Sequence, residues 1–414
     1  MDCNKAYRFR LKVRARKERV LTRYAGCCRF IWNKLLGLQM ARLDWDEWIL
    51  NYEQLCGVIT AWKMYRYPWL EDPPSQALQQ VARDLAKALK NAFNPKMPQA
   101  FPVFKRKADQ SDSFRIPQGF TWDKEHGIIE IPKLGRLKYF SSSKTEKIVG
   151  EPTQVTISRE GKHWFVSIGV EFEIDPEPVH PKNTAVGIDM GVVNFASFSD
   201  GEVLAPLNSF KRIEEKLAAA QQTLSHKVKF SSNWRKQVAV VNGIHRTIAN
   251  CRKDYINKAS TTVSNNHAFP VMEDLHVANM TASAAGTFEE PGKNVAAKSG
   301  LNKSILDQGW GDFRRKLTYK EQWRGGKVIL VPSQGTSQEC PLCGHKHAEN
   351  RRTRDTFSCL CCGFTGDADL VAATNILRRG TPYLPAGIVA LGLQEPIRHE
   401  EPAMELLGAG ISRL

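Results

Sequence analysis

Apolar and basic residues alternate along positions 5–14, KAYRFRLKVR, so that nearly every second side chain is charged. A period of two predicts a half-exposed strand with a basic outer face. Apolar residues then recur at helical spacing over 17–43 and again after Ser75, which is the predicted N-cap of that second helix. With a shorter helix expected over 52–65, residues 16–94 are predicted to form an all-helical block.

Short strand-like segments replace the helical pattern from about 112 to 178. Gly161 lies between two of them, in a position typical of a β-hairpin turn. Together with the strand at 5–14 these segments could close a small barrel, and the helical block would then be an insertion into it. A cluster of prolines marks the end of this region: Pro176, Pro178 and Pro181.

The rest of the chain predicts a succession of strands and helices. Three strands separated by turns come first, followed by two long polar helices, a buried strand, a further helix and another strand. These predictions cover 184–204, 209–262, 268–275, 305–323 and 327–332. A cysteine-rich segment and a short helix ending near residue 379 complete the pattern.

Four cysteines in two CxxC pairs predict a metal site. They form the pattern C-x2-C-x15-C-x2-C, and a glycine follows each pair. A CxxC turn places two thiolates about one tetrahedral edge apart, and the glycine lets backbone amides turn toward sulfur, so the two pairs suit structural Zn²⁺. The predicted ligands are Cys340, Cys343, Cys359 and Cys362, with Cys361, His345 and His347 as alternatives.

Asp189 interrupts the apolar run AVGIDMGV. A carboxylate in a buried strand is costly unless it binds a cation or hydrogen-bond donors. Gly187 and Gly191 flank the aspartate, and their lack of side chains predicts room for a ligand beside it.

Two further acids stand in comparable places. Glu273 lies in the apolar strand VMEDL, and Asp369 lies at the start of a predicted helix that Asp367 would cap. Each has a structural explanation of its own: a salt-bridged strand end for Glu273, and favourable interaction with the helix dipole for the two aspartates. Taken together in a basic protein, Asp189, Glu273 and Asp369 predict a Mg²⁺ site, in which two ions ~4 Å apart could activate a water and stabilise a leaving 3′-oxygen.

The composition narrows the classes of protein. With 414 residues, the chain is long enough for several domains of roughly 100–200 residues each. A hydrophobic content of 42% and a charged content of 25% exclude wholesale disorder. No apolar run is long enough to predict a membrane span, and the N-terminus lacks the apolar segment of a secretory signal. Ten cysteines, four of them paired as CxxC, indicate a reducing compartment.

An excess of basic residues indicates a polyanionic partner. The chain holds 59 Lys and Arg against 43 Asp and Glu, a formal charge of +16, and basic residues are dense over residues 1–40. A positive electrostatic field of this kind attracts nucleic acid, and the release of counterions adds to the binding affinity. A solvated face on an ordinary basic protein is the alternative. A membrane surface is disfavoured because no amphipathic lipid-facing helix is evident.

Four motifs resemble the nuclease half of TnpB proteins. In order along the chain they are GIDMG, VMEDL, the CxxC pairs and DADLVAATNI. TnpB proteins are RNA-guided endonucleases of insertion-sequence transposons and relatives of the type V CRISPR effectors. Five further segments are also similar to that family: KAYRFRLKV, GCCRFIWN, FPVFKRK, SFR and TSQECPLCG. The resemblance covers roughly residues 4–380, and the combination of motifs is specific, whereas any one alone would be weak.

The resemblance implies an α+β multidomain fold. An OB-like wedge β-barrel with an inserted helical recognition domain would precede an RNase H-like RuvC nuclease domain that a zinc ribbon interrupts. The implied boundaries are 1–15 and 95–181 for the wedge, 16–94 for the helical domain, 182–338 and 364–380 for the RuvC-like domain, 339–363 for the ribbon and 381–414 for a disordered tail.

The same resemblance implies Mg²⁺-dependent cleavage of DNA, with Asp189, Glu273 and Asp369 as catalytic acids and magnesium ligands. The family commonly has Asn where this chain has Val371, so Asp367 remains an alternative third acid. The implied partners are a guide RNA from the transposon end and a double-stranded DNA target beside a short adjacent motif, with no membrane. We expect a monomer within the ribonucleoprotein and a cytoplasmic location in a prokaryote.

The resemblance also assigns reading of the adjacent motif to the wedge and helical domains. Tyr52, Gln76 and Gln80 are the candidates there, because Gln can pair bidentately with adenine, although an ordinary polar helix face explains the two glutamines at least as well. Phosphate contacts would fix the register without specifying sequence. The candidates for such contacts are Lys105, Arg106, Lys107 and Arg115.

Three other functions fit parts of the pattern. A guided DNA-binding repressor would share the architecture without cutting, but retention of all three acids favours cleavage. An RNA-independent DNA resolvase or transposase would share the carboxylates. A zinc-ribbon transcription factor would leave the buried acids unexplained.

Overall fold

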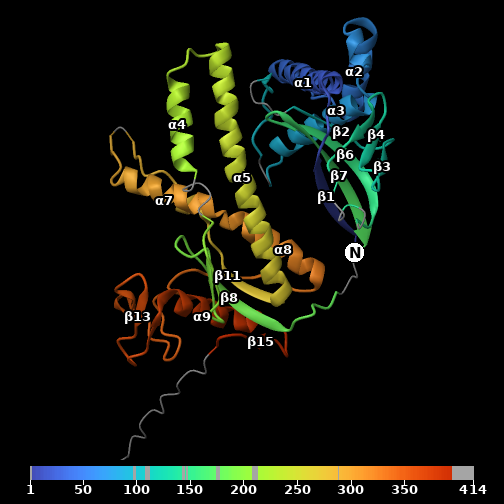
Figure 1. Cartoon of the computed structure of the whole chain (residues 1–414). Coiled ribbons are helices and arrows are strands. Elements are labelled where there is room, and N and C mark those ends of the chain that lie inside the picture. Colours follow the sequence, from blue (N-terminus) through green and yellow to red (C-terminus); the bar gives the residue numbers. More distant parts are fainter. Residues whose placement is uncertain are drawn as a thin grey trace, which may run out of the picture. The chain divides into compact units, whose positions relative to one another are not determined.

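The structure is a computed structural model that describes residues 2–96, 99–107, 112–141, 145, 148–173, 178–207, 213–287 and 289–393. The chain divides into two compact units, Met1–Pro176 and Glu177–Leu414 (Figure 1). The division falls within the proline cluster that the sequence predicts as a boundary. Each unit has a hydrophobic core of its own.

The first unit contains two antiparallel sheets. The larger pairs β1 (Asp2–Arg10), β7 (His163–Glu173), β6 (Glu151–Glu160) and β2 (Ser113–Ile116) in that order, and the smaller pairs β3 (Thr121–Asp123), β4 (Ile128–Ile131) and β5 (Gly135–Lys138). Gly161 turns the β6–β7 hairpin at a φ of +57°, as predicted. Among the described residues, an isolated bridge between Leu11 and Tyr139 joins the two sheets. Closure into one barrel stays a prediction.

The predicted helical block is confirmed. It consists of α1 (Ala15–Asp44), α2 (Tyr52–Tyr65), the 3-10 turn η1 (Pro68–Glu71) and α3 (Ser75–Ala92). The apolar stripe of α1 is buried in the core of this unit together with that of α3. Helices and strands of the first unit therefore share one core.

The prediction for Ser75 is wrong. Pro74 occupies the N-cap of α3, and Ser75 is the first helical residue, where its Oγ accepts a hydrogen bond from Lys63 Nζ at 3.1 Å. The side-chain cap of this block lies on α2 instead. Asn51 and Gln54 exchange side-chain-to-backbone hydrogen bonds of 2.9 Å, a capping box that satisfies two otherwise unpaired backbone donors.

The second unit is built on a mixed sheet. Its order is β10 (Val203–Leu204), β9 (Ala196–Phe198), β8 (Thr184–Met190), β11 (Phe269–Glu273) and β12 (Ile329–Val331). β8 runs antiparallel to β9 but parallel to β11, which is parallel to β12. All five strands lie where the sequence predicts them.

The predicted tail over 381–414 is wrong for its first part. Residues 381–393 form the 3-10 turn η4 (Thr381–Tyr383) and the strand β15 (Val389–Ala390), which pairs in parallel with the start of β8. The acidic composition of the last residues predicted a detached tail. A two-residue strand is also too short to show a period, so nothing in the sequence indicated this pairing. Residues 394–414 lie outside the described residues.

The helices of the second unit lie near their predicted positions with one difference. α4 (Glu214–Ser225) and α5 (Ser232–Asn266) form an antiparallel hairpin (Figure 1). The single helix expected near 305–323 is two helices, α7 (Val295–Gln308) and α8 (Trp310–Arg324), because Gly309 between them has a left-handed φ of +71°. No helix in the described part of the chain combines the length and apolarity that a membrane span requires.

The helix α9 (Ala368–Gly380) packs against β8. Ahead of it lie η3 (Ala348–Arg351) and a small antiparallel pair, β13 (Thr356–Ser358) and β14 (Thr365–Asp367), which carry the cysteine-rich segment. The sheet, α9 and this small ribbon together position the acids and the cysteines that the sequence singles out.

Candidate active site

Asp189 and Glu273 lie on neighbouring parallel strands. Ile188 of β8 is paired with Met272 of β11, so the residue after each of these is one of the two acids. Parallel strands end at the same edge of a sheet, which brings the two carboxylates together there. Burial raises the pKa of Asp189 to about 7, and the nearby charges of Glu273 and then Asp369 add to this rise. The raised pKa of Asp189 therefore depends in part on the charges of the other two predicted acids.

Glu273 has its own hydrogen-bond donor. Thr336 Oγ1 donates to Glu273 Oε1 at 2.6 Å. Burial raises the pKa of Glu273, and the hydrogen bond from Thr336 and the charge of Arg379 oppose the rise. The carboxylate is thus costly to bury but is held in one orientation.

Asp367 and Asp369 have different roles in the structure. Asp367 caps α9, because its Oδ1 accepts hydrogen bonds from the backbone N–H groups of Asp369 at 3.0 Å and Leu370 at 2.9 Å. The carboxylate of Asp369 does not cap the helix and contacts other side chains. Its Oδ1 accepts from Arg351 Nη2 at 3.3 Å and its Oδ2 from Asn194 Nδ2 at 3.5 Å. The contacts favour Asp369 as the third acid and Asp367 as the cap.

The glycines beside Asp189 do not leave room for a ligand. A Cβ on Gly187 would lie 2.0 Å from the backbone oxygen of Ala373, so this glycine lets α9 approach β8 closely. A Cβ on Gly191 would lie 2.8 Å from the backbone oxygen of Asn194. The sequence-based interpretation is therefore wrong at both positions, because the space is filled by backbone.

The three predicted acids do not form one compact group of ligand atoms. Within the part of the chain that the structure describes, only the four cysteines form a group of three or more potential ligands whose donor atoms all lie within 4.8 Å of one another. The carboxylates of Asp189, Glu273 and Asp369 are therefore more widely spaced than that. Hard oxygen ligands and an excess of negative charge suit Mg²⁺.

The sequence did not predict Arg351, Thr336 or Asn194 at this site. Arg351 ends η3 in the ribbon, and its guanidinium offsets part of the charge of Asp369. Thr336 lies four residues before the first ligand cysteine, within a segment that resembled TnpB but had no assigned chemistry. None of these three positions follows a hydrophobic period or a motif spacing, so only the folded chain shows these contacts.

The four predicted cysteines meet as a cluster. The Sγ atoms of Cys340 and Cys362 are 3.6 Å apart, and those of Cys343 and Cys359 are 3.5 Å apart. Four sulfurs at about 2.3 Å from a zinc ion would be about 3.8 Å apart, so the cluster fits tetrahedral Zn²⁺. Cys361 donates its backbone N–H toward Cys359 Sγ at 3.4 Å.

Each cysteine pair is followed by a left-handed glycine. Gly344 and Gly363 have φ values of +74° and +72°, which let the chain turn back around sulfur. The alternative ligands stay outside the four-sulfur cluster. The rings of His345 and His347 stack with centroids 6.0 Å apart, and His347 Nδ1 accepts from the backbone of Glu349 instead.

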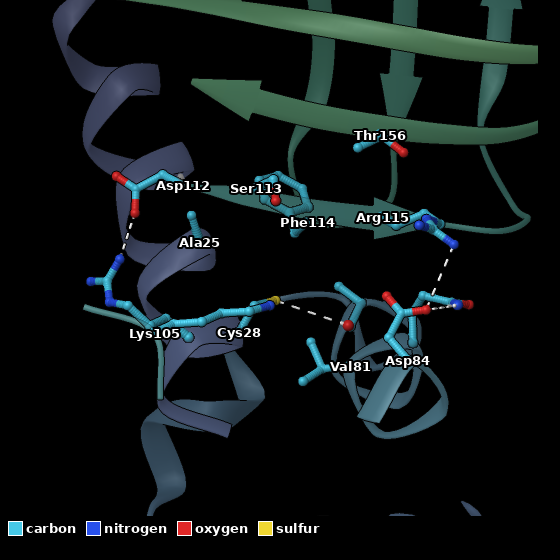
Figure 2. A pocket seen from close by; sticks show the side chains of 13 residues that line it. Ala25, Cys28, Val81, Asp84, Lys105, Asp112, Ser113, Phe114, Arg115 and Thr156 are labelled. Carbon is cyan, nitrogen blue, oxygen red and sulfur yellow. Dashed lines mark hydrogen bonds and ion pairs between the residues drawn. The ribbon is translucent and has the colours of Figure 1, made fainter. Parts of the chain in front are cut away.

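In the first unit, three predicted nucleic-acid contacts line one cavity. Gln80, Lys105 and Arg115 border a cavity of about 80 Å³ (Figure 2). Asp84 faces them: Gln80 Nε2 donates to its Oδ1 at 3.1 Å, and Arg115 Nη1 lies 3.7 Å from the same oxygen. Lys105 Nζ sits 3.8 Å above the ring of Trp32, and burial lowers the pKa of this lysine.

The other predicted contacts lie apart from this cavity. Tyr52 packs under Arg83, whose guanidinium carbon is 4.8 Å from the ring centre. Gln76 does not line the cavity, and Lys107 borders a separate hollow along α1. Arg106 is exposed. The structure thus gathers three of these residues and leaves the others separate.

The fold and the two sites define a class: a multidomain α/β protein that joins a carboxylate-bearing mixed sheet to a four-cysteine ribbon. Family models match three segments. A probable transposase family, OrfB of IS605, matches residues 166–284, a Cas12f1-like TNB domain matches 310–376, and a helix-turn-helix domain of IS605 OrfB matches 1–44. The last match covers one strand and one helix here, β1 and α1.

Relatives extend the similarity to the full chain. The Escherichia coli K12 protein named "Putative RNA-guided DNA endonuclease InsQ" is 44% identical over 96% of this chain and 98% of its own length. A Streptomyces pristinaespiralis protein with the same descriptive name is 29% identical over 91% of this chain and 89% of its own length. The chain therefore belongs to the TnpB-like IS605 OrfB family of transposon-encoded proteins.

Solved structures show a weaker likeness. A cryo-EM structure of a Cas12f1–sgRNA–target DNA complex aligns with 91% of this chain and 98% of that chain, at a TM-score of 0.48 and 13% identity.

Proposed function

We propose that this chain is an RNA-guided DNA endonuclease that binds a guide RNA from the transposon end. It cleaves complementary DNA beside a short adjacent motif by Mg²⁺-dependent phosphodiester hydrolysis. The observation that carries the proposal is the burial of Asp189 on β8 near two further carboxylates, from β11 and α9: burial, and then the charges of Glu273 and Asp369, raise the pKa of Asp189 to about 7. Such a cluster is costly to build unless it serves a cation.

Asp189, Glu273 and Asp369 would hold the ions. When bound, two Mg²⁺ ions supply an activated water and stabilise the leaving 3′-oxygen. The rest of the site orients these acids: Thr336 fixes one oxygen of Glu273, and Asp367 caps the helix that presents Asp369. Arg351 partly neutralises Asp369 while no cation is present.

The first unit would supply recognition. Its basic N-terminal segment suits a nucleic-acid backbone, which gives affinity without sequence information. In RNA-guided effectors, base pairing reads the target while the protein reads only the adjacent motif. We assign the wedge and recognition roles to this unit, with Gln80, Lys105 and Arg115 as candidate contacts and Tyr52, Gln76 and Lys107 as weaker ones. The names of the two relatives support the same activity.

A plasmid-cleavage assay tests the proposal. The full chain is purified with its co-expressed transposon-end RNA, the RNA is sequenced, and a plasmid carrying the matching target is offered with Mg²⁺. We expect cleavage by the wild-type protein and none by Asp189→Ala, with target binding retained in both. Binding without cleavage by the wild type would indicate a guided repressor, whereas cleavage that needs no RNA would indicate a resolvase or transposase.

A further inference from the structure

Thr336 lies between β12 and the first ligand cysteine and is almost fully buried, at 4% exposed. Its hydroxyl has two acceptors in reach, Glu273 Oε1 at 2.6 Å and the backbone oxygen of Ser333 at 3.2 Å. A hydroxyl has one hydrogen to donate. The shorter contact to a carboxylate is the stronger one, so the hydrogen points to Glu273 whenever that acid is ionised.

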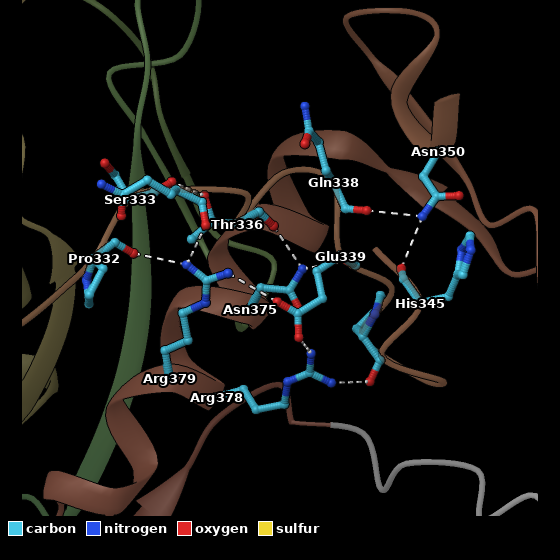
Figure 3. Close-up of polar contacts among 12 residues, drawn as sticks. Pro332, Ser333, Thr336, Gln338, Glu339, His345, Asn350, Asn375, Arg378 and Arg379 are labelled. Atoms are coloured by element: carbon cyan, nitrogen blue, oxygen red, sulfur yellow. Dashed lines mark hydrogen bonds and ion pairs between the residues drawn. The ribbon is translucent and has the colours of Figure 1, made fainter. Parts of the chain in front are cut away.

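The backbone around Thr336 is fixed by α9. Asn375 is fully buried, and its Nδ2 donates to the backbone oxygens of Thr336 at 2.8 Å and Glu339 at 2.7 Å (Figure 3). Both hydrogens of the amide are used in this way. One side chain of the helix therefore sets the position of Thr336 and of the residue before the first ligand cysteine.

Two arginines of α9 hold both ends of the same segment. Arg379 Nη1 donates to the backbone oxygens of Pro332 at 2.9 Å and Gln334 at 3.0 Å, and its Nη2 contacts Glu339 Oε2 at 3.0 Å. Arg378 pairs with Glu339 Oε1 (Figure 3). Residues 332–339, which we call the clamp segment, are thus tied to α9 along their whole length.

The arrangement has a consequence for the acids. α9 presents Asp369 in its first turn, and the same helix fixes the clamp segment that carries Thr336. Thr336 in turn holds Glu273 on β11. The second and third acids are therefore placed with respect to each other through one helix. Cys340 follows the clamp segment directly, so the ribbon anchors its other end.

We propose that Thr336 is a positioning residue for Glu273, and that the clamp segment holds the carboxylate site in register with the zinc ribbon. The inference rests on the proposed role of Glu273 as a metal ligand. Without the hydroxyl, Glu273 would lose its only short side-chain donor among the described contacts and would no longer be held in one orientation for a metal. Partners that orient a metal ligand typically change metal affinity by roughly 10–100-fold.

The test compares Thr336→Val, which keeps the shape of the side chain, with Thr336→Ser, which keeps the hydroxyl. Mn²⁺ is the probe, and its binding to the full chain as purified is followed by electron paramagnetic resonance. Asp189→Ala serves as the reference, because it retains any Mn²⁺ bound to co-purified RNA. We expect the carboxylate-site Mn²⁺ dissociation constant to rise roughly tenfold or more in Thr336→Val and to stay within about twofold in Thr336→Ser.

Zinc content and target binding should be unchanged in both variants. Thr336→Ala is measured in parallel, so that a Thr336→Val protein that fails to fold does not decide the outcome. Wild-type Mn²⁺ affinity in the variants without a hydroxyl would overturn the proposal, as would Mn²⁺ binding that Asp189→Ala leaves undiminished. If wild-type protein cleaves no DNA while the loss of the hydroxyl still weakens Mn²⁺ binding, the positioning role stands and the endonuclease function fails.

Discussion

The cysteine cluster and the carboxylate site lie in the same unit, but the chain builds them in different ways. The cysteines come from one short stretch between Cys340 and Cys362, and left-handed glycines shape both turns. The three acids come from two strands and a helix far apart in sequence, with β11 and α9 each arriving after a long intervening segment. One site depends on local turns, whereas the other depends on sheet register and helix docking.

This difference predicts how each site fails. The cysteine cluster depends on local turns, so one substitution can destroy it without disturbing the sheet. The carboxylate site depends on strand register and helix docking, so it can lose its function while the strands and the helix stay folded. The clamp segment is the described connection through which damage to the ribbon would reach Glu273. Substitutions that separate the two sites therefore test both the assignment and the connection.

The largest expected effect separates function from folding at the carboxylate site. Glu273→Gln keeps the volume and the acceptor for Thr336 but removes a charge that would bind metal. We expect DNA cleavage to fall by roughly a thousandfold or more, which corresponds to about 4 kcal/mol of lost transition-state stabilisation. Zinc content by elemental analysis and target binding by gel shift should match the wild type. Cleavage within threefold of wild type would remove Glu273 from the site.

A substitution in the ribbon should affect both sites, to different degrees. Cys359→Ser removes one of four sulfurs, so we expect zinc content to fall well below one ion per chain and the ribbon to lose several kcal/mol of stability. Cleavage should fall by roughly ten- to a hundredfold because the clamp segment loses its anchor. Cys361→Ser is the matched control, since Cys361 is exposed and outside the cluster. Full cleavage by a zinc-free Cys359→Ser protein would contradict the connection.

The raised pKa of Asp189 gives the carboxylate site a pH dependence. Between about pH 4 and pH 7 the folded chain keeps a proton on Asp189 that the unfolded chain releases. Without Mg²⁺, the contribution of Asp189 to the free energy of unfolding should therefore fall as the pH rises through this window and level off above pH 7. Asp189→Asn should remove this dependence and stabilise the magnesium-free protein by about 2–4 kcal/mol at pH 8. Urea unfolding at several pH values, in buffer without chelator, measures both.

Mg²⁺ affinity should have the opposite pH dependence, because the ion competes with the proton on Asp189. The affinity should rise with pH up to about 7 and change little above it. A difference in magnesium-free stability between the wild type and Asp189→Asn that stays constant from pH 5 to pH 7 would show that Asp189 is not the buried, repelled carboxylate described above.

The sequence predicted the parts of these sites that follow a spacing or a period. The CxxC pairs specify their own geometry, and the apolar runs around Asp189 and Glu273 specify buried strands. Thr336 and Arg351 were missed because their partners are set by how the ribbon docks, which has no local pattern. Gly187 was misinterpreted for the same reason, since the close approach of α9 cannot be deduced from the strand alone.

The smallest expected effect distinguishes the two aspartates at the start of α9. Asp367→Ala removes the oxygen that accepts from two backbone N–H groups, so it should cost about 1 kcal/mol of stability, as the loss of an N-cap does. Cleavage should stay within a few-fold of wild type because the carboxylate of Asp369 is retained. Asp369→Ala should abolish cleavage at little cost in stability, since it frees Arg351 and Asn194 without removing the cap. Chemical denaturation and the plasmid assay on both variants decide the matter: if Asp367→Ala is the inactive protein, the third acid is Asp367 and the helix begins with a ligand instead of a cap.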